Sequence, residues 1–275
     1  MSQCVKQFCL GLVVLLGASG CLYGKPTVEH HATSGAPGAH VLFMAGRDSH
    51  GPGAHEHEDG TRRLIADLRA RRPDIEVTAV YGGWPEEGAM LEGIDALVMY
   101  CDGGKRHPVN PHIAQFERLL DRGVGVVALH YCVEVPPKGV EAAAMLRAIG
   151  GYFETHWSVN PHWEADFSAL PEHPVTAGIE PFQMLDEWYF NMRFQPGGVS
   201  PLLSAVAPAH TMERGNGPHS GNDAVRELVA RGVPQVVAWA YERPGGGRGF
   251  GYTGGHFHHN WDDDNARNLV LNAIE

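Results

Sequence analysis

Hydrophobic residues along this chain occur in short runs that alternate with amphipathic stretches. The runs are five to seven residues long and span residues 41–45, 75–81, 94–100 and 124–129. Runs of this length, bounded by turn residues, are typical of strands buried in a sheet. The stretches between them have the spacing of helices and span residues 59–72, 111–122 and 140–149. This alternation predicts an α/β fold with a doubly wound, mostly parallel sheet.

The pattern changes after residue 150, where short apolar runs are separated by Pro and Gly turns. These runs predict strands over residues 153–157, 163–167, 188–194, 202–206, 236–241 and 249–253, followed by a helix over 262–274. No stretch between the two halves has the composition of a linker. We therefore expect one domain over residues 39–275, with a β-rich insertion in its C-terminal half before the last strand and helix.

The first residues have the pattern of a targeting segment. Lys6 precedes an apolar stretch over residues 8–16, and small residues lead up to Cys21. This pattern favours a bacterial lipoprotein signal peptide over residues 1–20, with a plain secretory signal or a membrane anchor as alternatives. Residues 21–38 are rich in Gly, Pro, Ser and Thr and predict a linker. We expect an exported protein, either periplasmic or anchored to the membrane by a lipid on Cys21.

The net charge and the residue composition limit the classes of ligand and partner that we expect. The 275 residues have a formal net charge of −11 and no long basic run, so nucleic acid is not an expected partner. The 17 histidines are many beside 21 lysines and arginines, and histidine is the commonest metal ligand. Within the expected domain over residues 39–275 the only cysteines are Cys101 and Cys132, each after a predicted strand. They predict two buried free thiols, with a disulfide as the alternative.

The segment over residues 49–58 holds three histidines and two glutamates directly after the first apolar run. The carboxyl ends of strands are the edge at which open α/β sheets bind ligands. Side chains of this kind can bind a metal ion or transfer protons. We expect His57 or Glu58 to act as a general base, and His50 and His55 to contact a substrate.

Two further clusters follow predicted strands. His130 comes after the run that ends at residue 129, and His256 comes after the run that ends at residue 253. Because such loops meet at one edge of a parallel sheet, we expect these side chains to lie together. His130 and His256, with Asp186 or Glu187, would make the three-ligand set of a catalytic divalent metal ion, with zinc favoured. One histidine of the first loop could join them, although no spacing matches a known zinc motif.

Aromatic and amide side chains near these clusters suggest a sugar ligand. Tryptophan faces suit sugar rings, although tryptophans also fill cores. The residues expected to contact substrate, besides His50 and His55, are Trp157, Asn160, His162, Trp188 and His258.

The chain resembles the ThuA-like (trehalose utilisation) family over about residues 40–275. The resemblance rests on ordered short pieces, among them Met44-Ala45-Gly46, Gly125-Val126-Val127-Ala128-Leu129-His130, Gly150-Gly151-Tyr152-Phe153-Glu154, Asp186-Glu187-Trp188-Tyr189 and Gly254-Gly255-His256. It implies a flavodoxin-like sheet similar to that of class I glutamine amidotransferases. His130 would stand at the amidotransferase nucleophile position and His256 at that of the late catalytic histidine. Since no cysteine stands at position 130, glutamine hydrolysis is not expected.

The family is associated with the catabolism of trehalose and related disaccharides, and relatives are linked to 3-keto-glycosides and to metal binding. The resemblance and the histidine clusters together predict a metal-dependent enzyme that cleaves a disaccharide or 3-keto-glycoside by hydrolysis or elimination. One alternative is a surface-tethered lipoprotein that binds sugar without turnover. Another is a hydrolase with Cys132 as nucleophile, although the glycines typical of a nucleophile elbow are missing around it.

Overall fold

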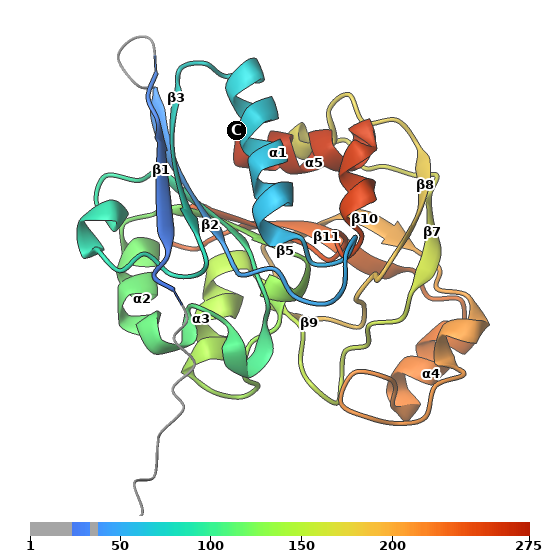
Figure 1. The fold of residues 1–275 in the computed structure, drawn as a ribbon. Helices are drawn as coiled ribbons and strands as arrows, with labels where there is room; N and C mark the ends of the chain where they lie inside the picture. The colour runs from blue at the N-terminus through green and yellow to red at the C-terminus, as the bar shows by residue number, and fades with distance from the viewer. Residues whose placement is uncertain (1–23, 34–37) are drawn as a thin grey trace, which may run out of the picture.

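A central sheet of eight strands organises the molecule, seen in Figure 1. The computed structural model describes residues 24–33 and 38–275. The predicted signal peptide and Cys21 lie outside the described residues. Within the described part of the chain, no helix combines the length and the apolar character needed to cross a bilayer.

Five parallel strands form the middle of the sheet. They are β2 (Ala39–Ala45), β3 (Ile75–Tyr81), β4 (Ala96–Tyr100), β5 (Gly125–Leu129) and β12 (Arg248–Tyr252). Their order in space is β3-β2-β4-β5-β12. Numbered along the chain, this is the 2-1-3-4-5 order of flavodoxin-like folds. The predicted fold class is confirmed.

Helices cover both faces of the sheet. Helices α1 (His57–Arg71) and α5 (Asp264–Ile274) lie on one face, and α2 (Ile113–Asp121) and α3 (Val140–Ile149) lie on the other (Figure 1). Alternate residues of β2 belong to different cores, since Phe43 packs with Leu64 of α1 while Met44 is in the cluster that contains Phe116 of α2. This two-sided burial explains why the parallel strands are apolar at nearly every position.

The segment between α3 and β12 forms the expected β-rich insertion. It contains the hairpin of β7 (Trp163–Phe167) and β8 (Phe182–Asp186), and the short pair of β6 (Gly151–Tyr152) and β9 (Arg193–Phe194). Its last strands, β10 (Val199–Ala205) and β11 (Gln235–Glu242), extend the main sheet in antiparallel orientation. The insertion also contains helix α4 (Asp223–Ala230), which the sequence pattern did not predict.

Two of the strand predictions in the insertion are wrong, one of them entirely and the other over most of its length. Residues 153–157 form mostly a turn, and residues 188–194 are irregular except for β9. The Ser158 hydroxyl fixes this region, because it accepts a bond from the Glu154 amide and donates to the Asn191 carbonyl. Local bonds from a side chain to the backbone replace a strand ladder here.

The expected linker over residues 21–38 is partly a strand. In β1 (Thr27–His31), Val28 lies opposite Val80 of β3 in antiparallel register. The segment therefore forms one edge of the main sheet. It was predicted as a linker because Pro and Gly residues lie on both sides of the strand.

Candidate metal centre

His130 occupies a sharp turn at the end of β5. Its φ angle is 55°, in a region that residues other than glycine rarely adopt. Its ring is fully buried, and Nδ1 lies 2.9 Å from the Thr253 carbonyl oxygen. Because a carbonyl oxygen only accepts, Nδ1 carries the proton, and Nε2 presents its lone pair to the interior of the site.

His55 approaches the same point from the loop between β2 and α1. Its backbone also has a positive φ, of 49°, and its amide donates to the His256 carbonyl at 3.0 Å. Its Nδ1 donates to Asp102 Oδ1 at 3.1 Å, which leaves the Nε2 lone pair facing His130. Backbone strain of this kind is concentrated at functional sites.

Asp186 holds the His256 loop in place and does not face the cluster. Its buried carboxylate accepts bonds from the amides of Gly255 and His256 at 2.7 and 3.0 Å, and from Asn260 Nδ2 at 2.8 Å. Burial raises the pKa of Asp186, and these donors oppose the shift. The expectation that Asp186 could be a metal ligand is therefore corrected, since its oxygens are used to position the loop.

Glu187 supplies the carboxylate of the cluster. Its Oε2 lies 3.2 Å from His256 Nδ1 and 3.6 Å from His130 Nε2. Tyr189 donates its hydroxyl to Oε2 at 3.1 Å, and Asn160 donates its amide to Oε1 at 3.0 Å. The bond from Asn160 orients Glu187, and the expected contact of Asn160 with a substrate stays a prediction.

Three imidazoles and one carboxylate thus form a ring of four metal-ligating atoms: His55 Nε2, His130 Nε2, Glu187 Oε2 and His256 Nδ1. His55 Nε2 lies 3.0 Å from His130 Nε2 and 3.0 Å from His256 Nδ1. Neighbouring ligands of a zinc ion bound at about 2.0–2.2 Å are roughly 3.0–3.5 Å apart. The spacing of the donor atoms fits a metal ion of this size.

The hydrogen bonds around the ring also fit a metal ion. The lone pairs of His55 Nε2 and His130 Nε2 face each other at 3.0 Å in a buried site, which is unfavourable unless a cation or a proton lies between them. The outer nitrogens donate to a carboxylate and a backbone carbonyl, which is the usual arrangement behind metal-ligating histidines. The residues present therefore fit a divalent cation.

The surroundings of His130 favour its neutral form. Burial and the neighbouring His55 hold the pKa of His130 well below its ordinary value. Burial alone would raise the pKa of Asp102, but hydrogen bonds from His55 and Ser49 outweigh it and lower that pKa to about 2. Histidine binds metals as the neutral ring, and a carboxylate hydrogen-bonded behind a ligating histidine orients that ring.

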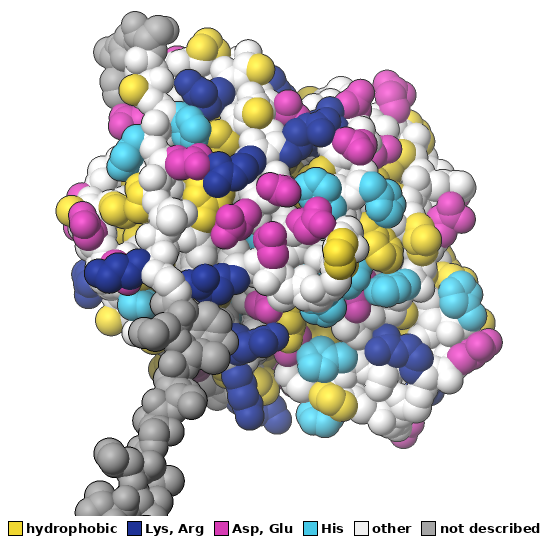
Figure 2. Space-filling model, in the orientation of Figure 1, with side chains coloured by type: hydrophobic (Ala, Val, Ile, Leu, Met, Phe, Trp, Pro, Cys, Tyr) yellow, Lys and Arg dark blue, Asp and Glu magenta, His cyan; other side chains and the backbone are white. Residues whose placement is uncertain are grey.

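Two exposed histidines lie beside the ring. His50 is exposed, with its ring centroid 3.9 Å from that of His55 and 5.7 Å from that of His256. The side chain of His162 is 51% exposed, and its ring lies 5.0 Å from His256. Several histidine side chains reach the surface on the face shown in Figure 2. His50 and His162 are thus exposed beside His256, and their expected contact with a substrate stays a prediction.

Other predicted site residues lie outside the ring. His57 is fully buried behind His55, where burial lowers its pKa to about 4, and its Nδ1 bonds the Arg47 carbonyl. Glu58 lies in the first turn of α1, and its amide bonds Asp48. His258 lies 3.4 Å from Glu56, between the two loops. His57 and Glu58 are thus poorly placed as general bases.

The two tryptophans predicted to contact substrate are placed differently. Trp188 is completely buried, donates to the Met184 carbonyl and packs against Phe167 and Tyr252, so its expected contact with substrate is corrected to a core role. Trp157 lies in the insertion under the guanidinium of Arg193, 3.7 Å from the ring centroid.

Cys101 and Cys132 are free and buried, as predicted. The alternative of a hydrolase with Cys132 as nucleophile does not fit the structure. The side chain of Cys132 is completely buried, and the imidazole next to it is that of His107, not His256. His107 donates from Nε2 to the Cys132 carbonyl and accepts the Val109 amide at Nδ1, so neither nitrogen is available to a metal ion.

Three residues with hydrogen bonds to site or neighbouring histidine and glutamate side chains were not predicted from the sequence: Asp102, Tyr189 and the buried Glu134. Asp102 follows β4, so its place at the end of a strand was a usable signal. Glu134 forms an ion pair with His219 at 2.9 Å, and this hydrogen bond raises the pKa of His219. His219, which lies in a loop rich in Gly and Pro, gave no comparable signal.

The His219–Glu134 pair predicts a pH-dependent stability. Because the pKa of His219 is raised on folding, its contribution is fully present below the ordinary value of 6.5 and is lost as pH rises through the raised pKa. We expect His219→Gln to lower the free energy of unfolding most near about pH 6 and progressively less at higher pH. Urea unfolding across this range measures the difference, with the exposed His210→Gln as control. A deficit that grows with pH would contradict the assignment.

Comparison with known proteins identifies the family. The model of the trehalose utilisation family, ThuA, matches residues 40–275. Crystal structures of ThuA-like proteins share the fold. The protein from Bacteroides uniformis has a TM-score of 0.58 at 16% identity, over 89% of this chain and 93% of that one. The protein from Parabacteroides merdae has a TM-score of 0.54 at 16% identity, over 86% and 88%.

A comparison with curated protein sequences finds no significant match. The family match covers nearly all of the described domain, including every residue of the metal-ligating ring. The chain therefore belongs to the ThuA family of trehalose utilisation, which places its role in carbohydrate metabolism.

Proposed function

We propose that this protein is a metal-dependent enzyme that cleaves the glycosidic bond of a disaccharide in its 3-keto form. The observation that carries the proposal is the buried cluster of three imidazoles and Glu187, whose ligand atoms lie within 4.8 Å of one another. The family supplies the carbohydrate class of the substrate. His50 and His162, which are exposed beside His256, are the side chains that we assign to contact with the sugar.

His55, His130, His256 and Glu187 would hold the cation, which supplies Lewis-acid stabilisation of negative charge on the keto oxygen of the sugar. Stabilising that charge makes the C–H bond next to the keto group acidic enough for a protein base.

His50 is the base that the geometry favours. Burial and the neighbouring His55 and His256 lower its pKa, so the ring is neutral near pH 7 and able to take a proton. It removes the proton from the carbon between the keto group and the anomeric carbon. The C–H electron pair forms the carbon–carbon double bond as the bond from the anomeric carbon to the glycosidic oxygen breaks.

We assign Tyr131 as the acid that protonates the departing oxygen. It directly follows His130, and its ring centroid lies 6.0 Å from that of His55. Burial and the nearby Glu134 raise its pKa to about 12, so the hydroxyl is protonated at neutral pH. The product alcohol thereby leaves uncharged, and the proton on His50 can return to Tyr131 through solvent.

Removal of the metal tests the proposal directly. We expect full chelation to abolish cleavage of 3-keto-trehalose, and one equivalent of zinc per chain to restore it. Turnover that persists in protein shown to be metal-free would contradict the enzyme mechanism. Binding of the sugar without turnover, with or without zinc, would favour the sugar-binding lipoprotein instead.

The base assignment predicts a selective loss of turnover. His50→Gln is expected to lower kcat by about 10²–10⁴-fold, the usual contribution of a general base, while zinc content stays at one per chain. His259→Gln is the control, because this histidine is exposed on the loop after β12. Loss of bound zinc together with kcat in His50→Gln would contradict the assignment of His50 as a base.

A further inference from the structure

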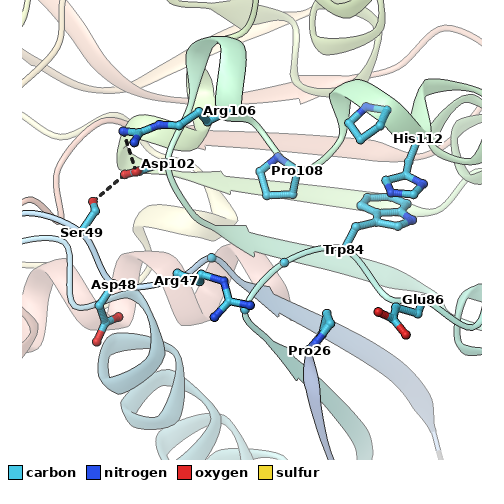
Figure 3. Close-up of a pocket in the computed structure, with 14 residues that line it drawn as sticks. Pro26, Arg47, Asp48, Ser49, Trp84, Glu86, Asp102, Arg106, Pro108 and His112 are labelled. Carbon is cyan, nitrogen blue, oxygen red and sulfur yellow. Dashed lines mark hydrogen bonds and ion pairs between the residues drawn. The ribbon is translucent and has the colours of Figure 1, made fainter. Parts of the chain in front are cut away.

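A large cavity lies beside the metal centre at the same edge of the sheet. It has a volume of about 630 Å³ and is formed by the segments that follow β2, β3 and β4 (Figure 3). Small-molecule sites commonly measure roughly 300–1,000 Å³. The chain passes from β2 to β3 on one side and then returns to β4 on the other side of β2. The cavity therefore lies at the topological switch point, where doubly wound sheets bind ligands.

The wall of the cavity combines hydrogen-bonding groups of both kinds with flat apolar surfaces. Arg47 and Arg106 are donors, while Asp48, Asp102 and Glu86 are acceptors. Trp84 lies parallel to His112 with ring centroids 5.6 Å apart, and three prolines complete the apolar part. Figure 3 shows Arg47 and Arg106 on one side of the cavity, and Trp84 stacked on His112 on the other side.

The charges of the wall are largely balanced. Arg106 bonds Asp102 at 3.3 Å, Lys25 lies 3.5 Å from Glu86, and Asp48 accepts the Glu58 amide at the start of α1. A strongly charged ligand in this cavity would therefore be attracted by some wall residues and repelled by others. Paired donors and acceptors beside apolar faces are suited to a neutral ring that carries hydroxyl groups.

Two residues belong to both the cavity and the metal centre. Ser49 and Asp102 line the cavity, and Asp102 Oδ1 also accepts bonds from His55 Nδ1 at 3.1 Å and from Ser49 Oγ at 2.7 Å. The His55 ring thus separates the cavity from the metal-ligating ring, with Nδ1 on one side and Nε2 on the other. A ligand that bonds Asp102 or Arg106 changes the hydrogen bonding behind a metal ligand.

We propose that this cavity is a second carbohydrate site, separate from the metal centre, and that it is coupled to zinc binding through Asp102 and His55. The sugar class and the coupling to zinc rest on the proposed function, while the site itself rests on the cavity wall. The coupling is reciprocal: if bound sugar changes the affinity for zinc by some factor, bound zinc changes the affinity for the sugar by the same factor.

Calorimetric titration of chelated protein with trehalose as the probe tests the site. We expect binding in the wild type, in Lys105→Gln and in His256→Ala, and at least a five-fold weaker affinity in Arg106→Gln. Lys105 is a matched control, since it lies in the same exposed turn as Arg106 but does not line the cavity. Equal affinity in Arg106→Gln, or binding that only His256→Ala removes, would overturn the proposal.

Zinc affinity measured with and without saturating trehalose tests the coupling. We expect a change of at least three-fold in the wild type and none in Arg106→Gln. An unchanged affinity in the wild type would overturn the coupling. Trehalose binding that depends on Arg106 in a protein without turnover would support the cavity site while refuting the enzyme mechanism, so the two proposals fail separately.

Discussion

His130→Ala is expected to remove stoichiometric zinc binding and, with it, cleavage of the sugar. The ring loses one of its three imidazoles, and the space left by the buried side chain offers no replacement donor. Removing only an outer partner of a metal ligand typically costs about 10–100-fold in affinity, so loss of the ligand itself should exceed that. Zinc content after dialysis and calorimetric titration with zinc measure the effect.

His259→Ala serves as the matched control, because it removes an exposed imidazole from the loop that carries His256. It should bind one zinc per chain with wild-type affinity. Wild-type zinc affinity in a folded His130→Ala protein would show that zinc binds elsewhere or that His130 is not a ligand.

Asp186→Asn is expected to give the largest loss of stability among the single substitutions considered. The carboxylate accepts bonds from three backbone amides and from Asn260, and an asparagine amide would place donors against some of these donors. Leaving such buried groups unsatisfied should lower the free energy of unfolding by roughly 3 kcal/mol. Urea unfolding measures it, with the exposed Asp166→Asn on the neighbouring strand as control.

The same substitution should also weaken zinc binding, because Asp186 fixes the backbone of His256. Destabilisation with unchanged zinc affinity would mean that the loop keeps its position without the carboxylate. A loss of less than about 1 kcal/mol would show that the bonds to Asp186 contribute no more than an ordinary hydrogen bond.

The buried parallel strands were the most predictable part of the fold. The bounds of β3 and α3 agree with the predicted ranges 75–81 and 140–149, because their apolar pattern and flanking Gly and Pro residues coincide. The insertion was less predictable. The turn at Ser158 depends on a bond to Asn191, more than thirty residues away, which no local pattern contains.

The place of the candidate metal centre could be predicted from the sequence, but not all of its residues could be chosen. His130 and His256 follow strands that meet at one edge of the sheet, and this topology brought them together. Neighbouring residues of an extended chain point in opposite directions, so Asp186 and Glu187 could not both face the ring. Which of them does so depends on the pairing of β7 with β8, which the sequence left undetermined.

The first loop shows a similar limit. His50, His55 and His57 are close in sequence, yet one is exposed, one contributes to the ring and one is buried at the start of α1. The positive φ angles of His50 and His55 set these directions. Since histidine adopts such angles only when tertiary contacts impose them, composition alone could not assign the three roles.

X-ray diffraction at the zinc absorption edge, from crystals of the zinc-loaded protein, would show directly whether the four residues hold the ion. We expect one anomalous peak per chain, within bonding distance of His55 Nε2, His130 Nε2, His256 Nδ1 and Glu187 Oε2. A protein that takes up zinc but shows the peak elsewhere, such as beside Cys101 and Cys132, or one that takes up no zinc, would contradict it.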